Sequence, residues 1–214
     1  MAAHRRAPAT LSLAICLALA ACSTAAPTSV PLFSGSGPGA TAATLPPASF
    51  GPPPSQTPPD DAAPLSLDSS LLALLPATVA GINVTEDPDA AAASLGNASL
   101  PALATALDAA VAVDAGNGNL VYALVVRIRP TAFGDEAFRQ WRDSYDQGAC
   151  AAGGGVIGNA GATLGGRQTF ITSCVGGMHT YHVFLKSQGI VISASAIGPG
   201  RFGELLVTNL RVPS

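Results

Sequence analysis

Leu120-Val-Tyr-Ala-Leu-Val-Val-Arg-Ile128 is the stretch of the sequence that decides the fold. It is rich in β-branched and aromatic residues, which favour strands. Its first half is apolar on both faces of an extended chain, and a strand of this kind is buried on both sides within a sheet. Pro130 ends the run because proline cannot donate a hydrogen bond to a neighbouring strand. We therefore predict a central strand over residues 120–128.

The folded domain is predicted to begin near Leu65 with a short helix and a short strand. Ser66 or Asp68 can cap the helix, which stops before Pro76 because the residue that precedes a proline is disfavoured in helical geometry. The strand covers residues 82–85.

Two further helices are predicted between this strand and the central one. The first begins at Asp87-Pro88, with proline in its first turn. The second begins at Ser99, because apolar residues then recur on one helical face. These residues are Leu100, Leu103, Ala104, Leu107 and Val111. Gly116-Asn117-Gly118 is predicted to end this helix.

An aromatic helix is predicted over residues 133–147, after the central strand. Its inward stripe consists of Phe133, Ala137, Phe138, Trp141 and Tyr145. Oppositely charged residues four apart are predicted on the exposed side, where each pair adds a few tenths of a kcal/mol. The pairs are Asp135 with Arg139, Arg139 with Asp143, and Arg142 with Asp146. The stripe is typical of a core anchor, and a ligand groove is the alternative.

The sequence after the aromatic helix predicts a glycine-rich loop, three strands and a closing helix. The strands cover residues 168–175, 180–186 and 190–197, and Ser187-Gln188-Gly189 makes the last two a hairpin. The helix covers residues 201–210. This order predicts an α+β domain over residues 65–214 with a largely antiparallel sheet, covered by helices on at least one face. The order is similar to that of small α/β/α sandwich lipoprotein domains of the PsbP/Mog1-like kind.

The amino-terminal residues Leu19-Ala20-Ala21-Cys22 resemble the lipobox of bacterial lipoproteins. His4, Arg5 and Arg6 precede an apolar run over residues 11–21, which is too short to span a bilayer. The resemblance implies cleavage of a signal peptide, residues 1–21, and lipid attachment to Cys22. It also implies an extracytoplasmic protein anchored in the bacterial cell membrane. An ordinary secretory signal with a chance cysteine is the alternative.

Residues 22–64 are predicted to form a disordered tether between the lipid and the domain. From Ser23 to Pro64 the chain has eleven prolines and no Lys or Arg, with many small and hydroxyl residues. Such a composition cannot bury enough apolar surface to offset the entropy of ordering. A spacer is therefore the predicted role, and a proline-rich ligand for an aromatic groove is the alternative.

The charge of the mature chain argues against nucleic acid as a partner. Removal of residues 1–21 takes away Arg5 and Arg6 and leaves eight Lys and Arg against thirteen Asp and Glu, a net charge of −5. Nucleic-acid binding requires a basic footprint, which this balance does not favour.

Two cysteines remain for chemistry in the mature domain. Cys16 lies in the predicted signal peptide and Cys22 carries the predicted lipid, which leaves Cys150 and Cys174. An extracytoplasmic compartment permits disulfides, so we predict a structural bridge between these two. A redox or metal role would favour a Cys-x-x-Cys pair or clustered histidines, which the sequence lacks, and no metal or cofactor is predicted.

The sequence contains no established catalytic motif, and no catalytic residue is assigned. Gly153-Gly154-Gly155-Val156-Ile157-Gly158 matches a dinucleotide-binding pattern, but it follows a helix instead of a strand. His179 and His182 point to opposite faces of a strand, so they do not chelate one metal together.

One candidate ligand face remains. Its residues are Arg127, Arg129, His182 and Lys186, with Thr180, Ser193 and Ser195 as possible neighbours. If the strands pair in register, this face is locally basic and suits an anionic ligand or a carboxylate-bearing partner. A solvated sheet face with salt bridges is the alternative.

Two functions follow from these observations. The first is a membrane-anchored envelope lipoprotein with a non-catalytic binding or interaction domain. The second is a small envelope hydrolase that uses His182 or His179 with a serine or a carboxylate. A histidine, a nucleophile and an acid that converge in one cleft would favour the enzyme.

Overall fold

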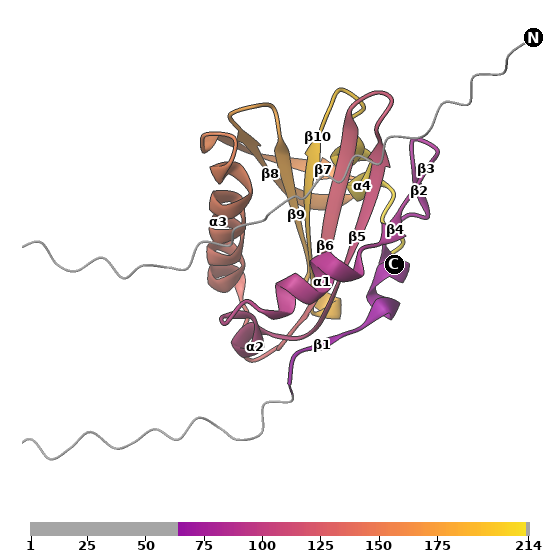
Figure 1. Cartoon of the computed structure of the whole chain (residues 1–214). Coiled ribbons are helices and arrows are strands. Elements are labelled where there is room, and N and C mark those ends of the chain that lie inside the picture. Colours follow the sequence, from indigo (N-terminus) through magenta and orange to yellow (C-terminus); the bar gives the residue numbers. More distant parts are fainter. Residues whose placement is uncertain (1–63, 213–214) are drawn as a thin grey trace, which may run out of the picture. The chain divides into compact units, whose positions relative to one another are not determined.

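The computed structural model describes residues 64–212 (Figure 1). The predicted signal peptide, the lipid on Cys22 and the predicted tether up to residue 63 therefore lie outside the described residues.

The domain is built on one mixed, largely antiparallel sheet, which confirms the predicted α+β class. Its strands lie in the order β1-β5-β6-β10-β9-β8-β7, and β4 pairs with β5 beside β1. Only the β1–β5 pair is parallel among these described pairs. The bounds are β1 Ser66–Leu67, β4 Thr85–Glu86, β5 Ala104–Asp114, β6 Asn119–Ile128, β7 Val156–Leu164, β8 Arg167–Cys174, β9 His179–Leu185 and β10 Ile190–Ile197.

The predicted central strand and the carboxy-terminal strands are confirmed. β6 is an interior strand, between β5 and β10, and Val121, Val125 and Val126 are fully buried. β9 and β10 form the predicted hairpin, which closes through the one-turn 3-10 helix η2 (Lys186–Gln188). Hydrophobic residues that are buried on both faces explain why β6 could be recognised from sequence.

The prediction of a long helix from Ser99 onward is wrong. The helix α2 (Leu100–Leu103) is a single turn, and the chain then continues as the long strand β5. β5 pairs with β6 from Ala104 to Asp114, and the Gly116-Asn117-Gly118 segment turns this hairpin instead of ending a helix. Alanine favours helices by less than 1 kcal/mol per residue. Burial of β5 against its neighbouring strands outweighs that preference.

The predicted glycine-rich loop is also corrected, because its second half forms the strand β7. β7 pairs with β8 along its length, and a two-residue turn at Gly165-Gly166 joins them. Both glycines have positive φ, at 56° and 77°, which the favoured tight hairpin turn requires. The sequence pattern hid the strand because small residues dominate it.

The helices lie on both sides of the sheet. α3 (Asp135–Ala151) forms hydrogen bonds to Ser193 and Ser195 of β10, whereas α4 (Phe202–Thr208) packs with Ile192 and Ala194. Alternate residues of a strand point to opposite faces, so α3 and α4 lie on opposite faces. The remaining elements are the 3-10 helix η1 (Ser69–Leu74), α1 (Pro88–Leu95), and a small hairpin of β2 (Thr78–Val79) and β3 (Ile82–Asn83).

Each face of the sheet has its own apolar cluster. One contains Leu71, Val79, Tyr181, Phe202 and Leu206, and the other contains Leu107, Leu124, Phe133, Phe138 and Val191. No helix in residues 64–212 combines the length and the apolar character that crossing a bilayer requires.

Candidate functional site

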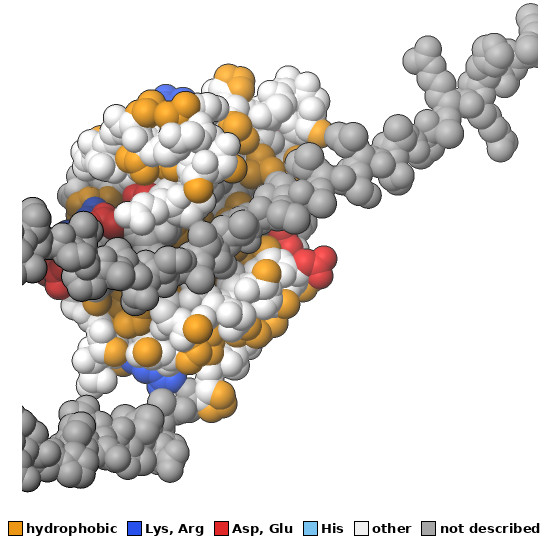
Figure 2. Space-filling view, turned by 60° about the vertical axis from the view of Figure 1, so that its left-hand side comes forward, with side chains coloured by type: hydrophobic (Ala, Val, Ile, Leu, Met, Phe, Trp, Pro, Cys, Tyr) orange, Lys and Arg blue, Asp and Glu red, His pale blue; other side chains and the backbone are white. Residues whose placement is uncertain are grey.

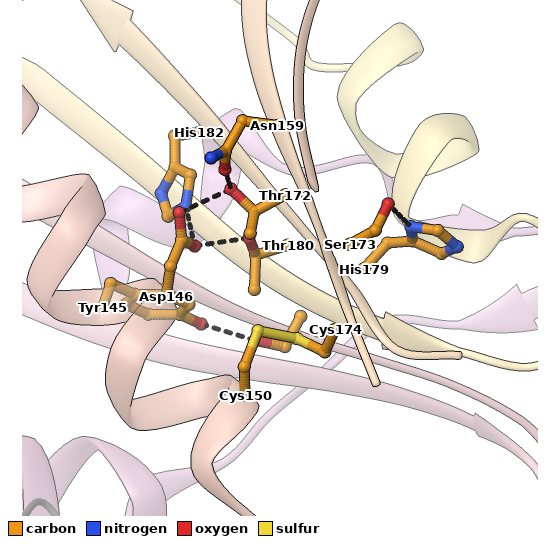
Figure 3. The surroundings of a disulfide bond; sticks show 11 residues. Tyr145, Asp146, Cys150, Asn159, Thr172, Ser173, Cys174, His179, Thr180 and His182 are labelled. Carbon is orange, nitrogen blue, oxygen red and sulfur yellow. Dashed lines mark hydrogen bonds and ion pairs between the residues drawn. A yellow bond between two sulfur atoms is a disulfide. The ribbon is translucent and has the colours of Figure 1, made fainter. Parts of the chain in front are cut away.

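A buried polar cluster lies between α3 and the sheet, and Asp146 is at its centre (Figure 3). Asp146 projects from α3, His182 and Thr180 from β9, and Thr172 from β8. His182 and Thr180 are 0 % exposed, Thr172 is 3 % and Asp146 is 6 %. Polar groups that are buried this deeply must be hydrogen-bonded to be tolerated.

Three side chains donate hydrogen bonds to the Asp146 carboxylate. His182 Nε2 lies 2.8 Å from Oδ1, and Thr180 Oγ1 lies 2.5 Å from the same oxygen. Thr172 Oγ1 lies 2.6 Å from Oδ2. An ionised carboxylate is an acceptor only, so these contacts require the proton of the imidazole to sit on Nε2. The arrangement therefore connects α3 to two adjacent strands.

The other ring nitrogen of His182 continues the chain of hydrogen bonds. Its Nδ1 lies 2.9 Å from Ser193 Oγ, which also accepts a hydrogen bond of 2.9 Å from Trp141 Nε1. An indole N–H is a donor only, so Ser193 accepts from Trp141, and the direction of its bond to His182 depends on whether Nδ1 carries a proton. Tyr145 packs edge-on against the imidazole and contacts Ser195 at 3.1 Å. The hydrogen bonds thus run from Trp141 through Ser193 and His182 to Asp146.

The ionisation of Asp146 reflects two opposing effects. Burial alone raises the pKa of this carboxyl group, because it disfavours the charged form. The hydrogen bonds and the attraction of His182, together with the hydroxyls of Thr172 and Thr180, outweigh burial and leave the pKa lowered. Burial also raises the pKa of the Tyr145 phenol, so this residue stays protonated.

The order Ser193–His182–Asp146 is that of a serine–histidine–acid relay, but it is not accessible to a substrate. Ser193 and His182 are both 0 % exposed, and the oxygen of Ser193 is already occupied by Trp141. A serine nucleophile must reach the carbonyl carbon of its substrate. In this conformation the relay therefore connects α3 to the sheet, and its serine is closed off from solvent.

Asp146 and Arg142 correct the predicted exposed face of α3. Asp146 does not pair with Arg142 in solvent but faces the sheet. The Arg142 guanidinium stacks over the Phe170 ring, 3.9 Å from its centroid. Arg139, which is predicted to pair with Asp135 and Asp143, contacts Glu136 at 2.8 Å instead. One pattern in the sequence could have shown that Asp146 faces the sheet. A spacing of four residues places it on the same side of the helix as Phe138, Arg142 and Cys150.

His179 lies apart from the buried cluster, as the alternation along β9 predicts. It is exposed, and its Nδ1 lies 3.1 Å from Ser173 Oγ (Figure 3). No carboxylate accompanies this pair among the described contacts. His179, the exposed histidine that the hydrolase hypothesis could use, therefore has no carboxylate partner among the contacts described for residues 64–212.

The predicted ligand face does not form as one surface. His182 pairs across the sheet with Ser193 on the α3 side, whereas Arg127 pairs with Ile190 on the α4 side. Arg127 and His182 therefore point to opposite faces, because strand register decides which residues share a side. Arg129 donates from Nε to the Pro101 carbonyl at 3.1 Å. On the side that Figure 2 shows, charged side chains lie in small groups and not in one basic patch.

Two of the predicted cations nevertheless line the same hollow. Arg127 and Lys186 contribute to a surface hollow of about 510 Å³ at the β9–β10 turn. Its other lining residues are Thr105, Ile128, Pro130, Phe133, Phe184, Ser187, Gln188 and Gly189. We call it the turn hollow. Two cations beside two phenylalanine rings suit a ligand that has both an anionic group and an apolar part.

Both cations of the turn hollow have acidic neighbours. Arg127 Nη2 lies 3.6 Å from Asp68 Oδ2, and Lys186 Nζ lies 2.5 Å from Asp135 Oδ1. The Lys186 side chain is 65 % exposed and that of Arg127 is 46 %. Exposed pairs of this kind contribute about 0–1 kcal/mol. A ligand carboxylate can therefore compete for either cation.

A second hollow, of about 290 Å³, lies between α3 and the β7–β8 hairpin. We call it the α3 hollow. Arg139, Arg142 and Asp143 line it from the helix, and Ala160 and Gly161 line it from β7. Asp146 and Thr172 reach its floor.

The structure pairs Cys150 with Cys174, as predicted (Figure 3). The bridge joins the last turn of α3 to the end of β8, and both residues are buried. It encloses the glycine-rich segment and β7, which lie between the two cysteines. The disulfide and the Asp146 cluster thus attach α3 to the same part of the sheet.

Within the described residues, no group of three His, Cys, Asp or Glu side chains is arranged to hold a metal ion. Comparisons with protein-family models, curated proteins and solved structures find no match for this chain.

Proposed function

We propose that the chain is a lipid-anchored protein of the bacterial cell envelope whose domain binds an anionic ligand or a carboxylate-bearing partner without catalysis. The anchor rests on the lipobox-like residues Leu19 to Cys22 and on the cation-free, proline-rich segment that follows them. The binding role rests on the turn hollow.

The observation that carries the binding role is that Arg127 and Lys186 line the same hollow as Phe133 and Phe184. The two phenylalanine rings contact each other edge to face, with centroids 5.4 Å apart. Phe133 is only 7 % exposed, so the half-buried Phe184 supplies most of the apolar wall. Lys186 Nζ stands 5.9 Å from the Phe184 centroid. A ligand whose carboxylate meets the cations can thus bury its apolar part against the rings. We infer that α3 and α4 cover the two sheet faces and leave this turn open.

A fatty carboxylate such as decanoate should bind to the mature chain and lose affinity in an Arg127→Gln/Lys186→Gln variant. A hydrogen bond to a charged group is worth about 1.5–3 kcal/mol, so we expect a loss of at least about tenfold. Isothermal titration calorimetry measures this change. Arg211→Gln is the matched control, because Arg211 is exposed and does not line the turn hollow. Equal affinity in the double variant would exclude the turn hollow as the site.

The hydrolase alternative draws support from the hydrogen-bond order of Ser193, His182 and Asp146. Three observations weigh against it: Ser193 is inaccessible, its oxygen accepts from Trp141, and the accessible His179 has only Ser173 beside it. Geometry precedes pKa in the assignment of a catalytic base, and here the nucleophile has no path to a substrate. We therefore favour binding over hydrolysis.

The lipid anchor makes a separate prediction. The mature wild-type protein should partition into the detergent phase of a Triton X-114 extraction, and Cys22→Ala should move it to the aqueous phase. Two or three acyl chains, at about 0.8 kcal/mol per buried methylene, account for the difference. Mass spectrometry of the mature amino terminus provides the check. An unmodified Cys22, or cleavage at another position, would show that the lipobox interpretation is wrong.

A further inference from the structure

The two edges of the sheet differ in how well they are protected from pairing with a strand of another chain. At one edge, β1 and β4 are two residues long each, and such short strands give a neighbouring chain little to pair with. At the other edge, β7 is nine residues long and has no charged residue and no proline. Proteins commonly protect edge strands with charges, prolines or short lengths, and β7 has none of these.

The backbone groups on the free side of β7 follow from its hairpin with β8. Leu164 and Arg167 flank the two-residue turn, so they form a hydrogen-bonded pair, and every second residue repeats this pattern. Asn159, Gly161 and Thr163 therefore direct their backbone N–H and C=O groups away from β8. Within residues 64–212, no backbone hydrogen bond outside the β7–β8 ladder reaches these three residues.

We infer that β7 is a dimerisation edge, which pairs antiparallel with β7 of a second copy about a twofold axis at Gly161. This register pairs Gly161 with its own equivalent and Asn159 with Thr163 of the partner subunit. Ala160 then lies opposite Ala162 of the partner subunit, at the positions where side chains approach most closely. Small residues on both sides allow the backbones to meet without a clash.

The charges beside Gly161 favour a second copy over an unrelated peptide. The α3 hollow presents charges of both signs alongside Ala160 and Gly161, namely Arg139 and Arg142 with Asp143. In a twofold interface each copy offers the same surface, so a patch must complement itself. Because arginine and aspartate stand side by side on α3, the twofold axis can bring opposite charges together at two equivalent places. A peptide of single charge would match only one of the two signs.

Apolar surface at the start of β7 extends the same edge. Val156 is 41 % exposed and Ile157 is 69 % exposed, the highest value among the large hydrophobic residues described as exposed. The proposed register brings Ile157 beside the Gly165-Gly166 turn of the partner subunit. Exposed apolar side chains of this kind are typical of interaction surfaces.

Disulfide trapping tests the register directly. A Gly161→Cys variant of the mature chain, with Cys22→Ala to remove lipid micelles, should form a covalent dimer in air. Directly opposed hydrogen-bonded residues lie about 5.5 Å apart at Cα, within the range that a disulfide spans. Thr163→Cys is the matched control on the same edge and should remain mostly unlinked, because the axis separates it from its own equivalent by four residue steps, about 13 Å. Equal cross-linking of both variants, or none in either, would overturn the proposal.

Sedimentation equilibrium of the same Cys22→Ala chain gives an independent measurement. We expect a dimer at tens of micromolar, and a monomer for Gly161→Pro, which removes an outward N–H without touching the β8 ladder. Gly161→Ala should remain dimeric, and an unchanged urea midpoint of Gly161→Pro shows that it still folds. A monomeric parent chain, including one that binds peptides at β7, would overturn the inference. Retained decanoate binding by that monomer would leave the proposed function intact.

Discussion

Replacing Asp146 with alanine should lower the free energy of unfolding by about 3–5 kcal/mol, because each buried donor that loses its acceptor costs about 1–3 kcal/mol. The substitution leaves the donors of His182 and Thr180 buried without their acceptor, and Thr172 keeps only Asn159 Oδ1 as an acceptor. It also removes the hydrogen bonds that connect α3 to strands β8 and β9 through this carboxylate. Urea denaturation followed by Trp141 fluorescence measures the loss.

Gln147→Ala is the matched control for this substitution. Gln147 lies on the same helix but is exposed and lines neither hollow, so its removal should change stability by less than about 0.5 kcal/mol. Equal effects of the two substitutions would contradict a structural role for the Asp146 cluster.

The lowered pKa of Asp146 also predicts how the free energy of unfolding changes with pH in the acid range. Near pH 4 the folded chain binds fewer protons than the unfolded chain at this group, so stability rises with pH. The contribution is complete above the ordinary aspartate pKa of 3.8 and is lost as pH falls through the lower value of the folded state. Asp146→Asn should therefore lose less stability than wild type below about pH 5. Parallel acid profiles of the two proteins would contradict this assignment.

Removal of the Cys150–Cys174 bridge should cost about 3 kcal/mol. The bridge closes a loop with a sequence separation of 24, and loop-closure entropy of the unfolded chain predicts a stabilisation of this size. The enclosed segment contains the glycines from Gly153 to Gly155, whose freedom in the unfolded chain is large. The denaturant midpoint of a Cys150→Ala/Cys174→Ala variant measures the effect without leaving a free thiol.

Thiol titration of native, air-oxidised protein provides the control. Ellman's reagent should find no free thiol at Cys150 or Cys174, and reduction of wild type should lower its midpoint as the double substitution does. Two titrating thiols in the native protein would show that the bridge does not form in solution.

The sequence predicts the elements whose hydrophobic pattern permits only one interpretation. Residues 120–128 and 190–197 are apolar, β-branched runs, and both are strands inside the sheet. The aromatic stripe of α3 has helical spacing and forms a helix. In each case local propensity and burial point to the same structure.

The alanine-rich segment from Ala104 to Asp114 shows where this reasoning fails. Its apolar residues fit a helical face and also fit alternation along a strand. The choice depends on pairing with β6 and β4, which no local pattern records. The prediction of a loop in place of β7 fails for a related reason. The glycines and alanines of this segment are typical of a loop, and only pairing with β8 orders them as a strand.

The candidate site could be predicted only in part, because it depends on register. Lys186 and Arg127 were identified as cations of interest, and the turn hollow brings them together. His182 was assigned to their face, but the pairing of β9 with β10 buries it beneath α3. Asp146 was placed in solvent because charge alone predicts exposure. A buried carboxylate needs specific partners, and these come from strands distant in the sequence.

A decanoate titration of the isotope-labelled mature chain with Cys22→Ala, followed by amide chemical shifts, tests the proposed binding site most directly. We predict the largest changes at Thr105, Gln188 and Gly189, which line the turn hollow, and small changes at Asn159 and Gly161 in the α3 hollow. Largest changes around Asn159 and Gly161, or no change at millimolar decanoate, would contradict binding at the turn hollow.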